Sequence, residues 1–311
     1  MKRRETVLHG IAATLIAGLA MAPVAMAPVA MAPVAIAQVA AAEDAAPQRI
    51  VVAGGDLTEI IYALGEQSRI VGVDVTATHP PEASSKAQIG YVRNIAPEGV
   101  LSLSPDLLLA AHDAGPAVAM ERLEAAGVPI AKAPETPSAA SIADKIMFVG
   151  KAIGAPDKAK ALATRFRDDL SAVTDKVGAF EADKPRVLFI LSARSGAPLV
   201  GGSDTEADEM IRLAGGENAG AAIDGYKPMS REAILAAAPE VILMMTHHAG
   251  RMGGIDAVID RPEIALTPAG QARRAVTMDG MFLLGFGPRT PEAIAQLARK
   301  LHPEAAEKAG L

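Results

Sequence analysis

The sequence has 311 residues, of which 50% are hydrophobic and 21% charged, enough for one large hydrophobic core or two smaller ones. A formal net charge of -6, with no basic run beyond the N-terminus, argues against nucleic-acid binding. The cysteine count of 0 excludes disulfides, so we expect an exported form to be a free protein, not lipid-anchored.

Residues 1–42 predict an export signal. Basic residues at 2–4 precede an apolar stretch at 11–20, and small residues dominate up to Ala42. A transmembrane anchor is the alternative, but the repeated Met-Ala-Pro-Val-Ala segment places prolines within the ~20 helical residues that a span requires. We expect cleavage near Glu43 and a periplasmic location, by Sec export as the default, with Arg3-Arg4 leaving twin-arginine export open.

Residues 43–137 predict an N-terminal lobe in which strands alternate with helices. A helix is predicted at 57–64, ended by Gly65, and a short one between Pro97 and Pro105. Predicted strands lie at 49–53, 70–74, 107–111 and 129–132. This alternation indicates parallel strands joined by right-handed crossovers.

Residues 138–180 predict the connection between two lobes. Apolar residues recur every three or four positions through most of this region, which predicts one long helical stretch. Gly154-Ala155-Pro156 should kink or briefly break it. We therefore expect a rigid spine helix.

Residues 181–311 predict a C-terminal lobe, with strands at 186–191, 241–245 and 275–278 and a terminal helix at 291–301. Glu98 and Glu232 each stand seven residues before a proline-acid pair and an apolar strand. This weak repeat favours two lobes built on related plans. The predicted fold class is α/β: two Rossmann-like lobes with central parallel sheets, joined by a long spine helix.

The most unusual chemistry lies in the loop before the strand at 107–111. Tyr91 and Arg93 are two residues apart, so their side chains project to the same side if the loop is extended. A phenolate oxygen beside a fixed positive charge suits a hard ferric ion carried by an anionic ligand. A loop tyrosine with a hydrogen-bonded hydroxyl is the alternative, and the residues alone leave both open.

Several motifs occur here in a specific shared order: Gly90-Tyr91-Val92-Arg93, then 97–107, 225–230, 265–270 and 284–291. In this the chain resembles the ferric-haem-binding periplasmic proteins of bacterial haem ABC importers, substrate-binding proteins with a helical spine. The resemblance implies that Tyr91 is the axial ligand of a ferric haem held between the lobes. It also implies delivery to an inner-membrane permease with its ATPase. An outer-membrane haem receptor system upstream is a further candidate partner, and we expect a monomer.

Other residue roles follow from the resemblance and from position. Arg93 is expected to pair with a haem propionate or with the phenolate, and Arg251 is the matching candidate across the cleft, since ligands sit outside the carboxyl ends of parallel strands. The resemblance implies that Glu98 and Glu232 dock on arginine pockets in the two halves of the permease. The alternative for both glutamates is interaction with their own helix dipoles, worth ~0.3–1 kcal/mol.

The pair His247-His248 invites a metal-site hypothesis. On a strand, adjacent residues point to opposite faces, so we expect no shared ion, while contact of either histidine with haem stays open. A histidine that some family members carry after the first C-lobe strand is missing from 192–196, so binding of two stacked haems does not carry over if it relies on that residue, and one or two haems stay open. The alternative ligand is a ferric siderophore or cobalamin. No positioned nucleophile is evident, so we expect a protein that is not an enzyme.

Overall fold

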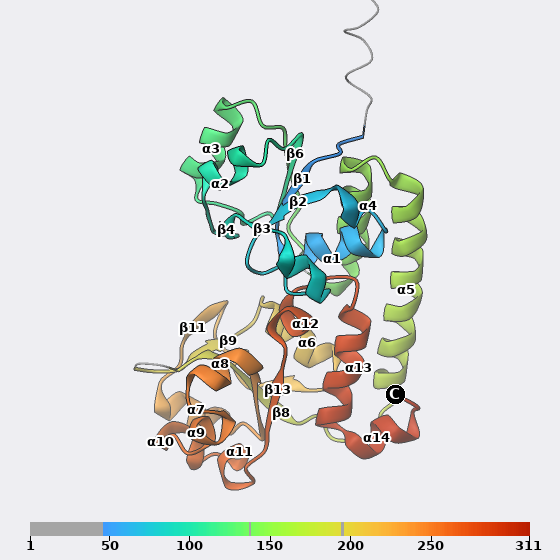
Figure 1. Ribbon diagram of the computed structural model, residues 1–311. Coiled ribbons are helices and arrows are strands. Elements are labelled where there is room, and N and C mark those ends of the chain that lie inside the picture. Colours follow the sequence, from blue (N-terminus) through green and yellow to red (C-terminus); the bar gives the residue numbers. More distant parts are fainter. Residues whose placement is uncertain (1–45, 137, 194–195) are drawn as a thin grey trace, which may run out of the picture. The chain divides into compact units, whose positions relative to one another are not determined.

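The fold is built on two sheets, which come from successive parts of the chain (Figure 1). The computed structural model describes residues 46–136, 138–193 and 196–311. The predicted leader lies outside them. The first sheet has the order β3-β2-β1-β6-β7, and every pair is parallel. Its strands are β1 (Ile50–Ala53), β2 (Ile70–Val73), β3 (Ala87–Gln88), β6 (Leu107–Ala110) and β7 (Ile130–Lys132). The continuous apolar runs of β1 and β6 are fully buried, as parallel strands covered on both faces require.

The second sheet has the order β11-β9-β8-β12-β13, with β10 also paired to β8. Its strands are β8 (Arg186–Ser192), β9 (Leu199–Gly201), β10 (Glu217–Asn218), β11 (Tyr226–Pro228), β12 (Val241–Met245) and β13 (Ala275–Met278). The predicted α/β class is confirmed, but β9 and β11 add antiparallel pairings that the sequence did not predict. The link from β8 to β9 is too short for a crossover, so the chain must return as a hairpin.

The predicted spine is two helices, α4 (Ile142–Ala152) and α5 (Pro156–Gly178), which pack side by side (Figure 1). The expectation of one long helical stretch is therefore wrong, although the break falls where it was predicted. Gly154 has a φ of +72°, which favours glycine, and Pro156 opens the next helix. A Cβ on Gly150 would lie 2.1 Å from that of Ala159, so the tight reversal needs glycine there.

The remaining helices cover the sheets and connect their strands. In the first half they are α1 (Gly55–Ala63), α2 (Pro97–Ser102) and α3 (Ala117–Ala125). In the second half they are α6 (Glu206–Leu213), α7 (Arg231–Ala237), α8 (Thr246–Arg251), α9 (Ile255–Ile259), α10 (Pro262–Ala265), α11 (Pro268–Gln271), α12 (Gly280–Leu284), α13 (Thr290–Leu301) and α14 (Pro303–Lys308). Among the described residues, no helix combines the length and apolar character needed to cross a membrane.

One buried apolar cluster includes residues of both sheets and of the helices between them, with Phe166 of α5 and Leu297 of α13 among its members. A bidentate ion pair joins the same parts: Arg289 Nη2 lies 2.5 Å from Glu59 Oε1, and Arg289 Nε donates to Glu59 Oε2 over 3.0 Å. Glu59 belongs to α1 and Arg289 caps α13. The motif at 284–291 therefore joins the helix that follows β1 to the C-terminal helices.

His302 predicts a loss of stability in acid. Its Nε2 lies 3.1 Å from the carbonyl oxygen of Gly215, and its ring packs edge-on against Phe180. Burial lowers the pKa of His302, despite the hydrogen bond to Gly215, and the charge of Arg274 acts in the same direction. The unfolded chain therefore binds the proton more readily. The contribution of His302 is complete above the ordinary pKa of about 6.5 and is lost as the pH falls through that value toward the lowered folded-state pKa.

We expect urea unfolding to give a lower free energy of unfolding at pH 5 than at pH 7.5, with a smaller drop for His302→Asn than for the wild type. His112→Asn, which changes an exposed histidine, is the matched control and should keep the full drop. An identical drop in His302→Asn and the wild type would show that His302 does not carry the effect.

Candidate ligand-binding site

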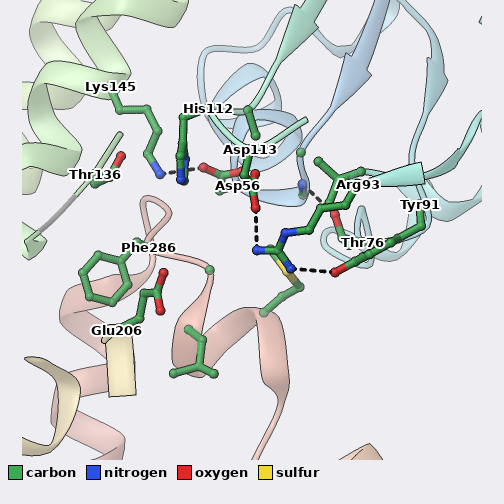
Figure 2. Close-up of a pocket in the computed structure, with 17 residues that line it drawn as sticks. Asp56, Thr76, Tyr91, Arg93, His112, Asp113, Thr136, Lys145, Glu206 and Phe286 are labelled. Carbon is green, nitrogen blue, oxygen red and sulfur yellow. Dashed lines mark hydrogen bonds and ion pairs between the residues drawn. The ribbon is translucent and has the colours of Figure 1, made fainter. Parts of the chain in front are cut away.

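A cavity of about 200 Å³ lies at the carboxyl ends of the first sheet's strands, where open α/β sheets bind ligands (Figure 2). The loops after β1, β2 and β6 line it, together with the hairpin that carries Tyr91 and with residues of α4, α6 and α12. Segments from both the first and the second part of the chain therefore line the cavity. Its apolar part comes from Met281, Leu284 and Phe286.

Tyr91 and Arg93 reach the cavity from a tight hairpin, not from an extended loop. Strands β4 (Gly90–Tyr91) and β5 (Asn94–Ile95) pair antiparallel, which leaves Val92 and Arg93 as the two turn residues. Gly90 has a φ of +100°, and a Cβ there would lie 2.7 Å from the Asn94 oxygen, so glycine is needed. The buried side chain of Val92 holds the turn, and Tyr91 is 40% exposed at the cavity edge.

Arg93 lies between Tyr91 and Asp113 (Figure 2). Its Nη1 donates to Tyr91 Oη over 2.9 Å, and its Nη2 lies 2.5 Å from Asp113 Oδ2. Partial burial lowers the pKa of Arg93, but the charges of Asp113 and Tyr91 outweigh it, so the net pKa is raised. A permanently charged donor therefore contacts the phenol oxygen at the edge of the cavity.

A second ion pair lines the same cavity. Lys145 Nζ of α4 lies 2.5 Å from Asp56 Oδ2, and both side chains are largely buried. Glu206 of α6 also lines the cavity and accepts a hydrogen bond from Tyr226 Oη over 3.0 Å. Burial raises the pKa of Tyr226, and the charge of Glu206 acts in the same direction. The lining therefore contains three acidic side chains and two basic ones, namely Asp56, Asp113 and Glu206, and Arg93 and Lys145.

Sequence reasoning missed Asp56, Asp113, Lys145 and Glu206. One signal was present for Lys145, which falls within the apolar stripe of Ile142, Ile146 and Val149, where a charged residue needs a partner. The others carry no comparable local signal, because ordinary loops and helix termini also hold acidic residues.

Arg251 does not lie in the cavity of Tyr91. It is the last residue of α8 and lines a separate cavity of about 230 Å³ with Ala193, Met252, Ala257 and Arg261. The helix that directly follows β12 carries it away from the strand end. Its pairing with a haem propionate stays a prediction.

His247 and His248 lie in α8, so the expectation that a strand separates them is wrong. Their ring centroids are 4.2 Å apart, and His248 Nδ1 lies 2.6 Å from the Leu191 carbonyl oxygen. Neither residue lines the cavity of Tyr91. Within the part of the chain that the structure describes, no group of three or more histidine, cysteine or acidic side chains is placed to hold a metal ion.

Glu98 and Glu232 are exposed in the first turns of α2 and α7. A hydrogen bond from its own backbone and one with Ser230 lower the pKa of Glu232. The acidic residues that follow the two prolines of the internal repeat make corresponding hydrogen bonds. Asp106 accepts from the backbone N–H of Arg49 over 2.9 Å, and Glu240 accepts from the backbone N–H of Arg186 over 2.8 Å. Each acid thereby holds the start of the central strand of its sheet.

Residues 50–281 match the family model described as periplasmic binding protein. Among solved structures, the periplasmic haem-binding protein RhuT from Roseiflexus sp. RS-1 is 39% identical, with a TM-score of 0.79 over 83% of this chain and 99% of that chain. The periplasmic haem-binding protein BhuT, in complex with two haems, is 42% identical, with a TM-score of 0.79 over 84% and 100%.

Curated relatives extend this picture. An uncharacterised ABC transporter substrate-binding lipoprotein of Bacillus subtilis is 29% identical over 83% of this chain and 81% of its own length. A cobalamin-binding protein of Halobacterium salinarum is 26% identical over 82% of this chain and 70% of its own length.

Proposed function

This chain belongs to the periplasmic binding protein family, whose members are substrate-binding proteins of ABC importers and not enzymes, and we propose that its substrate is ferric haem. The observation that carries the proposal is the hydrogen bond from Arg93 to Tyr91 Oη at an open cavity edge. A tyrosinate oxygen is a known axial ligand of haem iron. The haem-binding proteins among the similar structures support the same choice.

The cavity constrains how haem would lie. Its volume of about 200 Å³ is below the ~300–1,000 Å³ typical of small-molecule sites, so the macrocycle would extend beyond it toward solvent. Met281, Leu284 and Phe286 offer an apolar wall to the ring. The three carboxylates of the lining disfavour burial of both propionates, so we expect the propionate edge to face outward. Arg93 then acts mainly on the phenolate.

We further propose that the protein acts in the periplasm and delivers haem to an ABC transporter. Tyr91-bound haem would pass to an inner-membrane permease, and its ATPase would drive import. A form without a lipid anchor is part of the proposal, because the sequence contains 0 cysteines for lipid attachment. We also propose that an outer-membrane haem receptor system acts upstream and that the protein is a monomer.

Cobalamin is the second candidate, favoured by the relative from Halobacterium salinarum. Absorbance titration of the purified protein with haemin and, separately, with cyanocobalamin distinguishes the two. Haem binding through tyrosinate predicts a new ferric spectrum with haemin and no stoichiometric binding of cyanocobalamin. The reverse pattern would reject haem as the substrate.

We expect Arg93→Ala to weaken haem binding by roughly 1.5–3 kcal/mol, the range for a hydrogen bond to a charged group, while tyrosinate stays on the iron. The same loss is predicted for Arg251→Ala if Arg251 holds a propionate. Titration with haemin measures both, with Arg167→Ala on the exposed face of α5 as the control. Wild-type affinity in both variants would reject their roles.

A further inference from the structure

We propose that Asp74 is a positioning residue that fixes the hairpin of Tyr91 and Arg93 for ligand binding. The inference rests on the proposed function for its haem readouts, but its geometry stands independently. Asp74 directly follows β2 and is 0% exposed. Among the described residues, no cation forms an ion pair with it, and a buried carboxylate of this kind is costly unless hydrogen bonds satisfy it.

Both oxygens of Asp74 are fully used. Oδ1 accepts from the Gly54 N–H over 2.9 Å and from Thr76 Oγ1 over 3.0 Å. Oδ2 accepts from the Thr76 N–H over 3.0 Å and from the Val92 N–H over 3.2 Å. Burial raises the pKa of Asp74, while the bonds from Thr76, Gly54 and Val92 act in the opposite direction. The carboxylate is therefore held by backbone and hydroxyl donors.

Those donors belong to three segments that all line the cavity: the turn after β1, the loop after β2 and the hairpin turn. Thr76 extends the network, because its Oγ1 also accepts from the Gly55 N–H over 2.9 Å. Gly55 has no room for a side chain, since a Cβ there would lie 2.4 Å from the backbone carbonyl oxygen of Thr76. One buried carboxylate thus connects the three walls on the first sheet's side of the cavity.

Val92 stands between the two residues that the proposed function uses. Its N–H is bound by Asp74, and its carbonyl oxygen accepts from the Gly115 N–H over 2.9 Å. With both peptide groups held, the directions of the flanking Tyr91 and Arg93 side chains are fixed before a ligand arrives. Loss of the bond to Asp74 should leave the peptide groups of Val92 held by the Gly115 N–H alone among the described residues, which loosens the turn.

Four variants separate positioning from general stability. Thr76→Val removes the hydroxyl that bridges Asp74 and Gly55 and keeps the size of the side chain, whereas Thr76→Ser keeps the hydroxyl. Asp74→Asn turns an NH₂ group toward backbone donors. Thr58→Val is the control, because it removes another buried hydroxyl, which donates to the Gly54 carbonyl over 3.1 Å and does not contact Asp74.

Hydrogen–deuterium exchange of the haem-free protein gives the first readout. Exchange across 90–95 should accelerate in Asp74→Asn and Thr76→Val, and stay at the wild-type rate in Thr76→Ser and Thr58→Val. If Asp74→Asn does not fold, the comparison of Thr76→Val with Thr76→Ser decides. Unchanged exchange in Thr76→Val, or equal acceleration in Thr58→Val, would overturn the proposal.

Haem binding gives the second readout. Thr76→Val should bind haemin on the order of tenfold more weakly, with a shifted iron–phenolate band, and Thr76→Ser should restore both. A wild-type band and affinity in Thr76→Val would show that the network is only structural. A wild-type protein without any phenolate spectrum would reject haem as the substrate, and the exchange measurement would still decide the positioning role.

Discussion

Tyr91→Phe should abolish the iron–phenolate charge-transfer bands of the haem complex and weaken haem binding more than any other single substitution considered for this cavity. The change keeps the ring and removes the oxygen that Arg93 contacts over 2.9 Å. Loss of a group that merely supports a metal ligand costs roughly 10–100-fold in affinity, and loss of the ligand itself should cost more. Absorbance titration with haemin measures both effects.

Tyr226→Phe is the matched control for this experiment. Its hydroxyl donates to Glu206, which itself lines the cavity, so this variant removes a nearby phenol oxygen without touching the proposed ligand. We expect the ferric spectrum of Tyr226→Phe to match the wild type. An unchanged spectrum in Tyr91→Phe, or lost bands in Tyr226→Phe, would move the axial ligand away from Tyr91.

The double variant Glu98→Lys with Glu232→Lys should leave folding and haem spectra nearly intact but greatly reduce haem-stimulated ATP hydrolysis by the reconstituted transporter. Both carboxylates are exposed in the first turns of corresponding helices, outside the ligand cavity. If each binds one half of the permease, the second contact forms at high effective concentration, so the two should act together. Either single reversal should therefore give a partial loss.

Charge reversal alone must be separated from docking. Asp157→Lys with Glu304→Lys is a matched control, since both acids are exposed in first helical turns, of α5 and α14. This control should lose the same helix-dipole energy, ~0.3–1 kcal/mol per residue, and retain full stimulation. Full stimulation by the Glu98 and Glu232 double variant would show that these glutamates are only helix-terminus charges.

The alternation of strands and helices could be predicted because it follows from local patterns of apolar residues. The apolar runs of β1, β6, β8 and β12 are long enough to indicate buried parallel strands without any distant contact. Two features were not predictable in this way. The reversal between α4 and α5 depends on the close approach of Ala159 to Gly150, and the hairpin position of β9 depends on its pairing with β8.

The same difference between local patterns and distant contacts applies to the residues of the ligand-binding site. Tyr91 and Arg93 are two residues apart, so their proximity could be predicted from the sequence, although the loop that carries them is a tight hairpin and is not extended. Asp113 comes from the loop after β6, and only the pairing of β6 beside β1 brings it there. Lys145 and Glu206 come from α4 and α6, and only the packing of these helices near the first sheet brings them to the cavity. The wrong strand assignment of His247 and His248 has a local cause, because α8 begins directly after β12 without a loop residue to mark the boundary.

Resonance Raman spectroscopy of the purified wild-type protein with one equivalent of haemin shows whether the protein binds ferric haem through the Tyr91 phenolate. Excitation within the charge-transfer band should enhance phenolate ring and iron–oxygen modes, and the iron–oxygen mode should shift when ¹⁸O-labelled tyrosine is incorporated. A stable haemin complex without tyrosinate modes would show that Tyr91 is not the iron ligand, and a spectrum identical to that of free haemin would show that the protein does not bind haem.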